Sequence, residues 1–460
     1  MMMLHNALEY AKNNYDQAIS RLIEWLAIPS VSTDPAYKAD VQRAAEWAAN
    51  YLRSLELHTE TIATTGHPLV YAEWLQAGPD RPTLLIYGHY DVQPAAIADG
   101  WTSDPFTPFV RDGLVYARGA TDDKGQAFAQ LTAVEAWLRG TKGLPLNLKV
   151  ILEGEEESGG RSLAQFVQEQ SKRLRADACV LSDTSMAHID QPVITFGVRG
   201  IVAMELTIQG PSNDLHSGMY GGSVLNPIKA LVDILSQLHD HEGRVAVPHF
   251  YDEVRPLSSA ERAAMAAVAY SEAQWQQETG APIPWGENGY SLSERIGARP
   301  TLEINGISGG YAGVGFKAVI PAQASAKISC RLVADQDPLV IYERVKDTVE
   351  RLTPPQVKSE LRYLSSGWPA SVDLESPAMR AAVRAYEQGW GASPIFKREG
   401  GSLPIVADLQ KHLGMPVIMM GFGLNSDGLH GPNEHFSLEM FRRGVQTAIH
   451  FIHEFAHMNG

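Results

Sequence analysis

The sequence predicts an α/β domain with a mixed, largely parallel sheet, interrupted by an inserted α+β domain. Three observations support this prediction. The chain has 460 residues, more than one hydrophobic core usually supports. Short apolar runs alternate with helical stretches over its first part, and this rhythm returns after Gly367. Between these parts, longer alternating segments indicate antiparallel strands with one solvent-exposed face.

A βαβ pattern in the first part predicts the parallel sheet. Apolar runs at 83–87, 146–152 and 178–181 are typical of buried strands. Helices are predicted at 125–139 and 163–175, between consecutive strands. Strands that alternate with helices in this way usually pair in parallel.

The inserted domain is predicted from the alternating segments 201–208 and 324–333. Residues 261–279, rich in Ala, Glu and Gln, are predicted to be helical. The α/β rhythm returns with a helix at 377–390 and a strand at 416–420. The predicted division assigns residues 1–195 and 367–460 to the interrupted domain, and 196–366 to the insert.

Charge and cysteine content exclude several classes of protein. The 53 acidic and 38 basic residues give a formal charge of -15, which repels nucleic acid and anionic lipid headgroups. No apolar run reaches the roughly 18 residues of a membrane-spanning helix, and the first residues lack the pattern of a signal peptide. Cys179 and Cys330 both lie in apolar runs and are expected to be buried free thiols. We therefore expect a cytoplasmic protein without a nucleic-acid or membrane partner.

Potential metal ligands follow four of the predicted strands. These residues are His89 and Asp91 after 83–87, the acidic run Glu153 to Glu157 after 146–152, Asp183 after 178–181, and His430 after 416–420. Because the carboxyl ends of parallel strands share one edge of a sheet, we expect them to converge. A fifth loop contains Asp122 and leads directly into a predicted helix.

Histidines and carboxylates without a thiolate suit Zn²⁺, Mn²⁺ or Co²⁺, and the carboxylates are numerous enough for two ions. Each part also has a structural explanation. A lone His-x-Asp after a strand is more often a satisfied turn, and an acidic run such as 155–157 is usually a solvated helix start. Their joint occurrence at strand ends favours a metal site.

One further motif competes with this interpretation. His453-Glu454-Phe455-Ala456-His457 matches the H-E-x-x-H pattern of single-zinc proteases. The motif lies three residues from the C-terminus, on a helix whose apolar residues resemble core contacts, and no downstream ligand follows it. We therefore expect no zinc there.

Three motifs resemble the metal-site signatures of the M20 metallopeptidases, and they are Gly88–Pro94, Gly119–Gly125 and Glu156–Gly159. Three further motifs extend the resemblance over nearly the whole chain and are closest to the branch of cytosolic nonspecific dipeptidase and carnosinase. These are Asp214–Gly222, Val319–Pro321 and Arg398–Ser402. The resemblance implies a catalytic domain and an inserted lid or dimerisation domain, with a homodimer formed through the insert.

The resemblance also implies a ligand set for two divalent ions, Zn or Mn, with Co as a further option. One ion would be bound by His89 and Asp183, the other by Glu157 and His430, with Asp122 bridging them. Glu156 would be the general base that activates a water between the metals for hydrolysis of a dipeptide or short peptide. Glu155 makes a third consecutive glutamate, and the following Glu-Ser-Gly sequence sets this register.

Asp91 resembles the carboxylate that orients the imidazole of His89. The Asp122–Asp123 peptide bond is expected to be cis, again from the resemblance.

Residues in and after the insert resemble the substrate-binding part of the family. His216 resembles a histidine that stabilises the oxyanion in the partner subunit's site, and Arg331 resembles the residue that binds the substrate carboxylate. Gly400, Gly401 and Ser402 are expected to contact substrate. From residue type alone, His216 could cap a loop and Arg331 could be a surface cation.

Two other functions remain open at this point. An amidohydrolase that removes an acyl group from an amino acid would use the same metal site, since specificity is not encoded in the ligands. A non-enzymatic protein that kept the fold would lack a ligand or the base, and none is missing here. The segment 241–297 lies in the insert and varies in the M20 family, so the resemblance assigns it no role beyond a contribution to the shape of the pocket.

Overall fold

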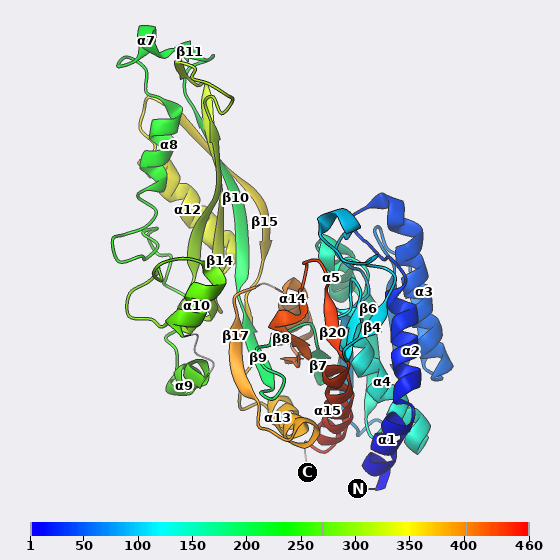
Figure 1. Ribbon diagram of the computed structural model, residues 1–460. Helices are drawn as coiled ribbons and strands as arrows, with labels where there is room; N and C mark the ends of the chain where they lie inside the picture. The colour runs from blue at the N-terminus through cyan, green and yellow to red at the C-terminus, as the bar shows by residue number, and fades with distance from the viewer. Residues whose placement is uncertain (1, 268–270, 402, 459–460) are drawn as a thin grey trace. The chain divides into compact units, whose positions relative to one another are not determined.

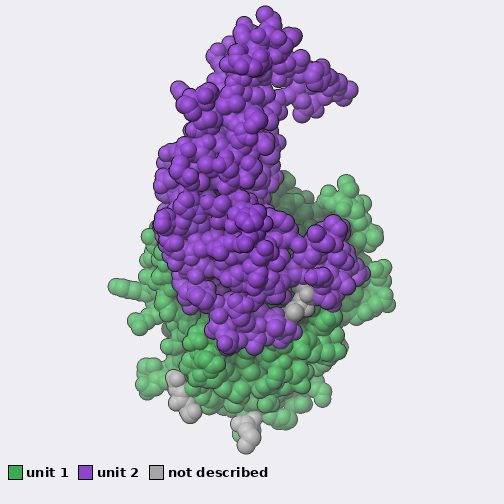
Figure 2. Space-filling model, turned by 90° about the vertical axis from the view of Figure 1, so that its left-hand side faces the viewer, with its two compact units in different colours: residues 1–196, 372–397, 408–460 green, residues 197–371, 398–407 purple. Residues whose placement is uncertain are grey.

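The structure is a computed structural model that describes residues 2–267, 271–401 and 403–458. Clustering of the chain gives two compact units, coloured separately in Figure 2. Unit 1 comprises Met1–Phe196, Val372–Lys397 and Asp408–Gly460, and unit 2 comprises Gly197–Ser371 and Arg398–Ala407. The predicted fold class, an α/β domain interrupted by an α+β insert, is confirmed.

The unit boundaries differ from the predicted ones in the last third of the chain. Residues 367–371 and 398–407 belong to unit 2 rather than to the returning domain. The first segment pairs with the end of the strand Val193–Val198. The second contains Arg398, whose guanidinium forms an ion pair with Glu261.

Unit 1 is an α/β domain (Figure 1). Its helices are α1 (Met2–Asn13), α2 (Tyr15–Leu26), α3 (Lys38–Ser54), α4 (Lys124–Thr141), α5 (Arg161–Glu169), α6 (Ser171–Leu174), α13 (Pro377–Trp390) and α15 (Leu438–Ala456), with 3-10 turns η1 (Pro35–Tyr37), η2 (Ile97–Asp99), η3 (Glu156–Ser158) and η4 (Asn425–Asp427). Its strands are β1 (His58–Ile62), β2 (Leu69–Trp74), β3 (Thr83–His89), β4 (Phe109–Arg111), β5 (Leu114–Tyr116), β6 (Asn147–Glu153), β7 (Ala178–Leu181), β8 (Ser185–Met186), β18 (Val417–Met419), β19 (Gly423–Leu424) and β20 (His435–Ser437). The chain passes between the units within β9 (Val193–Val198), β17 (Ile395–Glu399) and α14 (Pro404–Leu413).

The central sheet brings the predicted ligand-bearing strands together. Within the described residues it has nine strands, in the order β1-β2-β6-β3-β7-β18-β9-β16, where β16 is Ala370–Ser371, and β17 also pairs with β9. The neighbours β6, β3, β7 and β18 are mutually parallel, so their carboxyl ends share one edge. The predicted parallel core is confirmed, and flanking antiparallel strands make the sheet mixed.

The buried sheet explains why the strand-end residues are fixed. Every residue of β6 and β7 is buried, as expected for parallel strands covered on both faces. Helix α4 is buried along nearly its whole length because α1, α2 and α15 also pack against it. The loop before α4 is therefore attached to one of the least exposed elements of unit 1.

Unit 2 contains a second, antiparallel sheet in the order β12-β14-β10-β15. Its strands are β10 (Gly200–Gln209), β11 (Leu215–His216), β12 (Thr301–Gly309), β13 (Val319–Ile320), β14 (Gln323–Leu332), β15 (Lys358–Gly367) and β16 (Ala370–Ser371). Its helices are α7 (Ser217–Tyr220), α8 (Pro227–Leu235), α9 (Ser259–Ala267), α10 (Glu272–Thr279), α11 (Leu292–Gly297) and α12 (Pro338–Leu352).

The alternation predicted for the insert is present in the structure. Along β10 every second side chain is buried, and these apolar residues form a separate core with α8 and α12. The helical stretch predicted at 261–279 is divided between α9 and α10.

Cys179 and Cys330 are buried free thiols, as predicted. Over the described part of the chain, no helix is long and apolar enough to span a membrane.

Candidate metal centre

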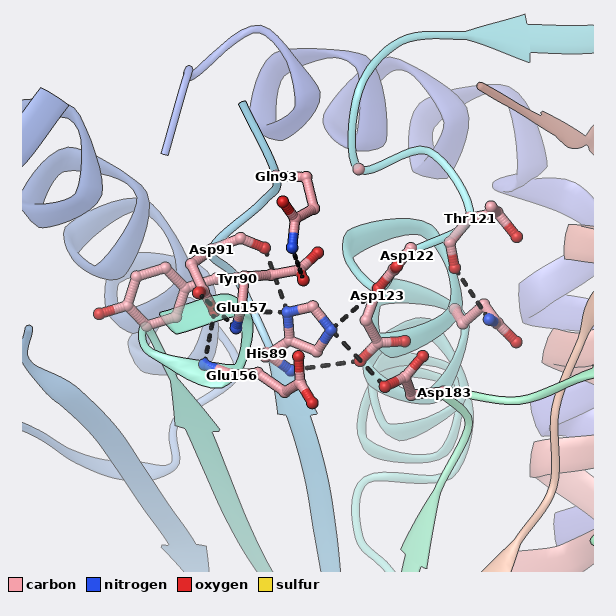
Figure 3. Close-up of polar contacts among 12 residues, drawn as sticks. His89, Tyr90, Asp91, Gln93, Thr121, Asp122, Asp123, Glu156, Glu157 and Asp183 are labelled. Atoms are coloured by element: carbon pink, nitrogen blue, oxygen red, sulfur yellow. Dashed lines mark hydrogen bonds and ion pairs between the residues drawn. The ribbon is translucent and has the colours of Figure 1, made fainter. Parts of the chain in front are cut away.

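His89, the last residue of β3, lies at the centre of a first group of potential ligands. Its side chain is fully buried, and its Nε2 atom is 3.1 Å from Oδ1 of Asp122 and 3.7 Å from Oδ2 of Asp183. Figure 3 shows the imidazole pointing toward both carboxylates. Asp183 follows β7, the strand beside β3, so adjacent parallel strands supply two of the three side chains.

His430 is the centre of a second group. Its Nε2 atom is 2.9 Å from Oδ2 of Asp122 and 3.4 Å from Oε2 of Glu157. The amide of Gln93 donates a 2.6 Å hydrogen bond to the same Glu157 oxygen. Asp122 is therefore common to both groups and presents one carboxylate oxygen to each.

The five residues form a donor set that fits divalent transition metals. In each group the three potential ligand atoms lie within 4.8 Å of one another, which allows all three to approach one ion at about 2.0–2.2 Å. Imidazole and carboxylate donors without sulfur suit Zn²⁺, Mn²⁺ or Co²⁺. The Asp122–Asp123 peptide bond, at the start of α4, is cis as predicted.

Asp91 connects the His89 loop to the acidic turn η3. Its two carboxylate oxygens accept the backbone N–H groups of Glu156 and Glu157, at 3.2 and 3.1 Å. The Nδ1 atom of His89 lies 3.1 Å from the Asp91 carbonyl and 3.4 Å from Oδ1. Asp91 thus holds both the imidazole and the turn, which is broader than the predicted contact with His89.

Glu156 belongs to neither group, but it lies close enough to interact electrostatically with residues of both. No hydrogen bond to its carboxylate is found among the described residues. Burial raises the pKa of Glu156 to about 8; His89 lowers it in part, and the carboxylates of Asp183 and Glu157 raise it further. Glu155, in contrast, accepts backbone N–H groups from His67 and Ser162.

The crowded carboxylates and imidazoles shift one another's pKa. Burial raises the pKa of Asp183 well above its ordinary value, and the neighbouring Asp122 adds to this shift. For Asp122, hydrogen bonds to His430 and His89 outweigh burial and lower the pKa. The same contact with Asp122, followed by that with Glu157, raises the pKa of His430 to about 10. Such a concentration of negative charge favours a bound cation.

Two buried side chains that the sequence analysis did not select support the Asp122 loop. Glu434 accepts hydrogen bonds from three backbone N–H groups of this loop. Lys124, which is fully buried, donates to the carbonyls of Trp25 and Ile28. A signal was present for Glu434, since it follows the predicted ligand His430 by only four residues.

His216 lies in unit 2 on an exposed element. It ends the short strand β11 and caps α7, where its Nδ1 accepts a 3.0 Å hydrogen bond from Gly218 N–H. The alternative role as a loop cap is therefore present in the structure. His216 lies outside the two metal-ligand groups.

Arg331 lies on β14 of unit 2, where a second arginine accompanies it. Arg199, which the sequence analysis did not select, has its pKa lowered to about 10, first by burial and then by the positive charge of Arg331. The Arg199 backbone N–H donates to the carbonyl of Gly401, and its Nε donates to that of Gly400. Arg199 is thus bonded to Gly400 and Gly401 and lies close enough to Arg331 for the two charges to interact. The predicted Ser402 lies outside the described residues.

The H-E-x-x-H motif has other contacts. Glu454 forms a 2.5 Å ion pair with Arg384, and the His453 ring stacks on Trp137. Within the described residues, the metal-ligand groups include neither His453 nor His457.

Comparison with known proteins shows the family. Residues 85–454 match the model of peptidase family M20/M25/M40. The chain belongs to this family. The Cys-Gly metallodipeptidase of Candida albicans is 32% identical over 95% of this chain and 94% of that protein.

Two solved structures resemble this M20 peptidase over nearly its full length. Human carnosine dipeptidase 1 has a TM-score of 0.80 and 29% identity, covering 99% of each chain. The metallo-carboxypeptidase Sso-CP2 of Sulfolobus solfataricus has a TM-score of 0.83 and 28% identity, covering 95% of this chain and 99% of that one. This protein is therefore a metallopeptidase, and its two ligand groups support the use of a divalent metal ion.

Proposed function

We propose that this M20 peptidase hydrolyses the peptide bond of dipeptides with two divalent ions, Zn or Mn, with Co as a further option. The observation that carries the proposal is the sharing of Asp122 between two ligand groups, one centred on His89 and the other on His430. The printed names of the relatives, a Cys-Gly metallodipeptidase and a carnosine dipeptidase, support a dipeptide as substrate.

Glu156 is the general base of the proposed reaction. The bound ions would supply a more acidic water and a polarised scissile carbonyl. The Glu156 carboxylate takes a proton from the attacking water and returns it to the leaving amine nitrogen. Its position beside both groups, with no hydrogen bond to it among the described residues, leaves its oxygens available for this transfer. Asp91 positions Glu156 through the backbone N–H of that residue.

Arg331 is proposed to bind the terminal carboxylate of the substrate. A guanidinium forms two parallel hydrogen bonds with a carboxylate. The neighbouring Arg199 adds positive charge in the same region of unit 2, and Gly400 and Gly401 are expected to line the substrate there.

A homodimer formed through unit 2 is proposed to bring His216 to the partner's site. Large apolar side chains are exposed near this histidine. Met219, on α7, is one of them, and β13, which pairs with β11, brings the segment before it close to His216. Val314 and Phe316, shortly before β13, are almost fully exposed. Exposed apolar patches of this kind commonly mark protein interfaces.

The substrate class can be tested with purified protein loaded with Zn²⁺ or Mn²⁺. A panel of dipeptides, tripeptides and N-acetyl amino acids should show hydrolysis of dipeptides as the fastest reaction. Faster release of acetate would support the deacylase alternative. Faster release of the C-terminal residue from tripeptides would support a carboxypeptidase, as the name of the Sulfolobus relative suggests.

A further inference from the structure

Glu434 and Arg118 form a buried pair between the two loops that carry Asp122 and His430. Oε2 of Glu434 lies 2.6 Å from Nη1 of Arg118. The two side chains are 0% and 3% exposed. Glu434 follows His430 by four residues, and Arg118 precedes Asp122 by four.

The Glu434 carboxylate is saturated with donors from the Asp122 loop. Oε1 accepts the N–H groups of Thr121 at 2.9 Å and Asp122 at 3.1 Å. Oε2 accepts the N–H of Gly119 at 3.0 Å in addition to the arginine. These bonds fix the backbone from which the Asp122 carboxylate extends.

Arg118 makes the reciprocal contact with the His430 loop. Its Nη2 donates a 3.1 Å hydrogen bond to the carbonyl of Gly431, the residue after His430. The N–H of Ala117 donates to the carbonyl of Glu434 at 3.1 Å. Each loop therefore supplies one charged side chain that bonds to the backbone next to a candidate ligand of the other.

We infer that the Glu434–Arg118 pair positions Asp122 and His430 relative to one another and thereby sets the affinity for the ion that they share. This inference rests on the proposed metal site. Neither residue belongs to a ligand group, so both are positioning residues. Residues that support ligands in this way commonly change metal affinity by about 10–100-fold when replaced.

The test compares Glu434→Gln with a matched control. Glu287→Gln also neutralises a buried glutamate paired to an arginine, Arg299 at 2.7 Å, but in unit 2. Metal-free proteins are titrated with Zn²⁺ by calorimetry, and melting temperatures are recorded. We expect Glu434→Gln to weaken one Zn²⁺ equivalent at least tenfold, while Glu287→Gln lowers the melting temperature and leaves both affinities within about twofold.

Equal Zn²⁺ affinities in Glu434→Gln and the parent would overturn the inference and leave the pair a purely structural role. If Glu434→Gln does not fold, Arg118→Lys is measured instead. That change keeps the positive charge and removes the planar guanidinium, so it should lower the affinity for the same Zn²⁺ ion to a smaller extent. An unchanged Zn²⁺ affinity would equally overturn the inference. Because the readout is metal affinity, it decides the matter even if the parent hydrolyses no dipeptide.

Discussion

The two units hold their candidate functional residues in different ways. In unit 1, His89 and Asp91 are fully buried at the end of a parallel strand, and hydrogen bonds fix them. In unit 2, His216 is exposed at the end of a two-residue strand, and Arg331 is only half-buried. The buried and hydrogen-bonded His89 and Asp91 are preorganised for metal and for chemistry, although His430 of the same unit is 58% exposed. The more exposed residues of unit 2 suit binding to molecules that arrive from outside.

The largest effect is expected for Glu156, and it distinguishes the proposed base from the metal ligands of unit 1. Glu156→Gln removes the proton acceptor without touching a ligand, so turnover should fall by about 10³-fold or more. Steady-state hydrolysis of the best dipeptide measures this. Turnover within tenfold of the parent would remove Glu156 from the role of base.

The next effect tests whether unit 2 completes a partner's site. His216→Ala should lose about 100-fold in activity if the histidine stabilises the oxyanion, whereas His58→Ala, an exposed histidine of unit 1, should not. After subunit exchange with Glu156→Ala, half of the dimers are mixed and each has one restored site. About a quarter of parental activity should then return. If exchange is demonstrated and no activity returns, the shared-site proposal is wrong.

A smaller effect is expected for substrate binding by Arg331. Arg331→Met should raise KM by about tenfold or more and change kcat less, because the carboxylate contact is present throughout the reaction. Arg362→Met, at an exposed arginine of β15, is the matched control. A dipeptide amide, which lacks the carboxylate, should not discriminate between parent and Arg331→Met; a similar KM increase for this amide would contradict the role.

The smallest effect concerns protons at the metal site. The pKa of His430 is raised to about 10 by Asp122 and Glu157, so the metal-free protein keeps this proton between about pH 6.5 and 10. The stability that this proton adds to the metal-free protein is present below pH 6.5 and is lost as the pH rises through 10. Metal binding requires the neutral imidazole and should release protons at pH 7.5, with affinity falling at lower pH. Calorimetry in two buffers of different ionisation enthalpy measures this release, and its absence would contradict the assignment of His430.

The sequence predicted the helices, strands and loops that follow a local pattern of residues. It missed side chains whose role depends on contacts with residues distant in the chain. Helix α13 was predicted at its observed bounds, and its ends are set locally, by the N-cap Ser376, by Pro377 in the first turn and by the C-cap Gly391. Four of the ligand-bearing loops were recognised because each follows an apolar strand, and the fifth, with Asp122, because it leads directly into a helix. Glu434 was missed because its hydrogen-bond partners, Arg118 and the backbone of the Asp122 loop, are distant from it in the sequence. The cytoplasmic location remains a prediction.

The central claim is that two ions are held by unit 1 and share Asp122, with Glu156 outside both ligand sets. The most direct test is the metal content of parent, Glu156→Gln and Glu157→Gln proteins purified in parallel and measured by mass spectrometry. The account predicts two ions per chain in the parent and in Glu156→Gln, and close to one in Glu157→Gln. A parent with a single ion, or loss of metal from Glu156→Gln with full occupancy in Glu157→Gln, would contradict it.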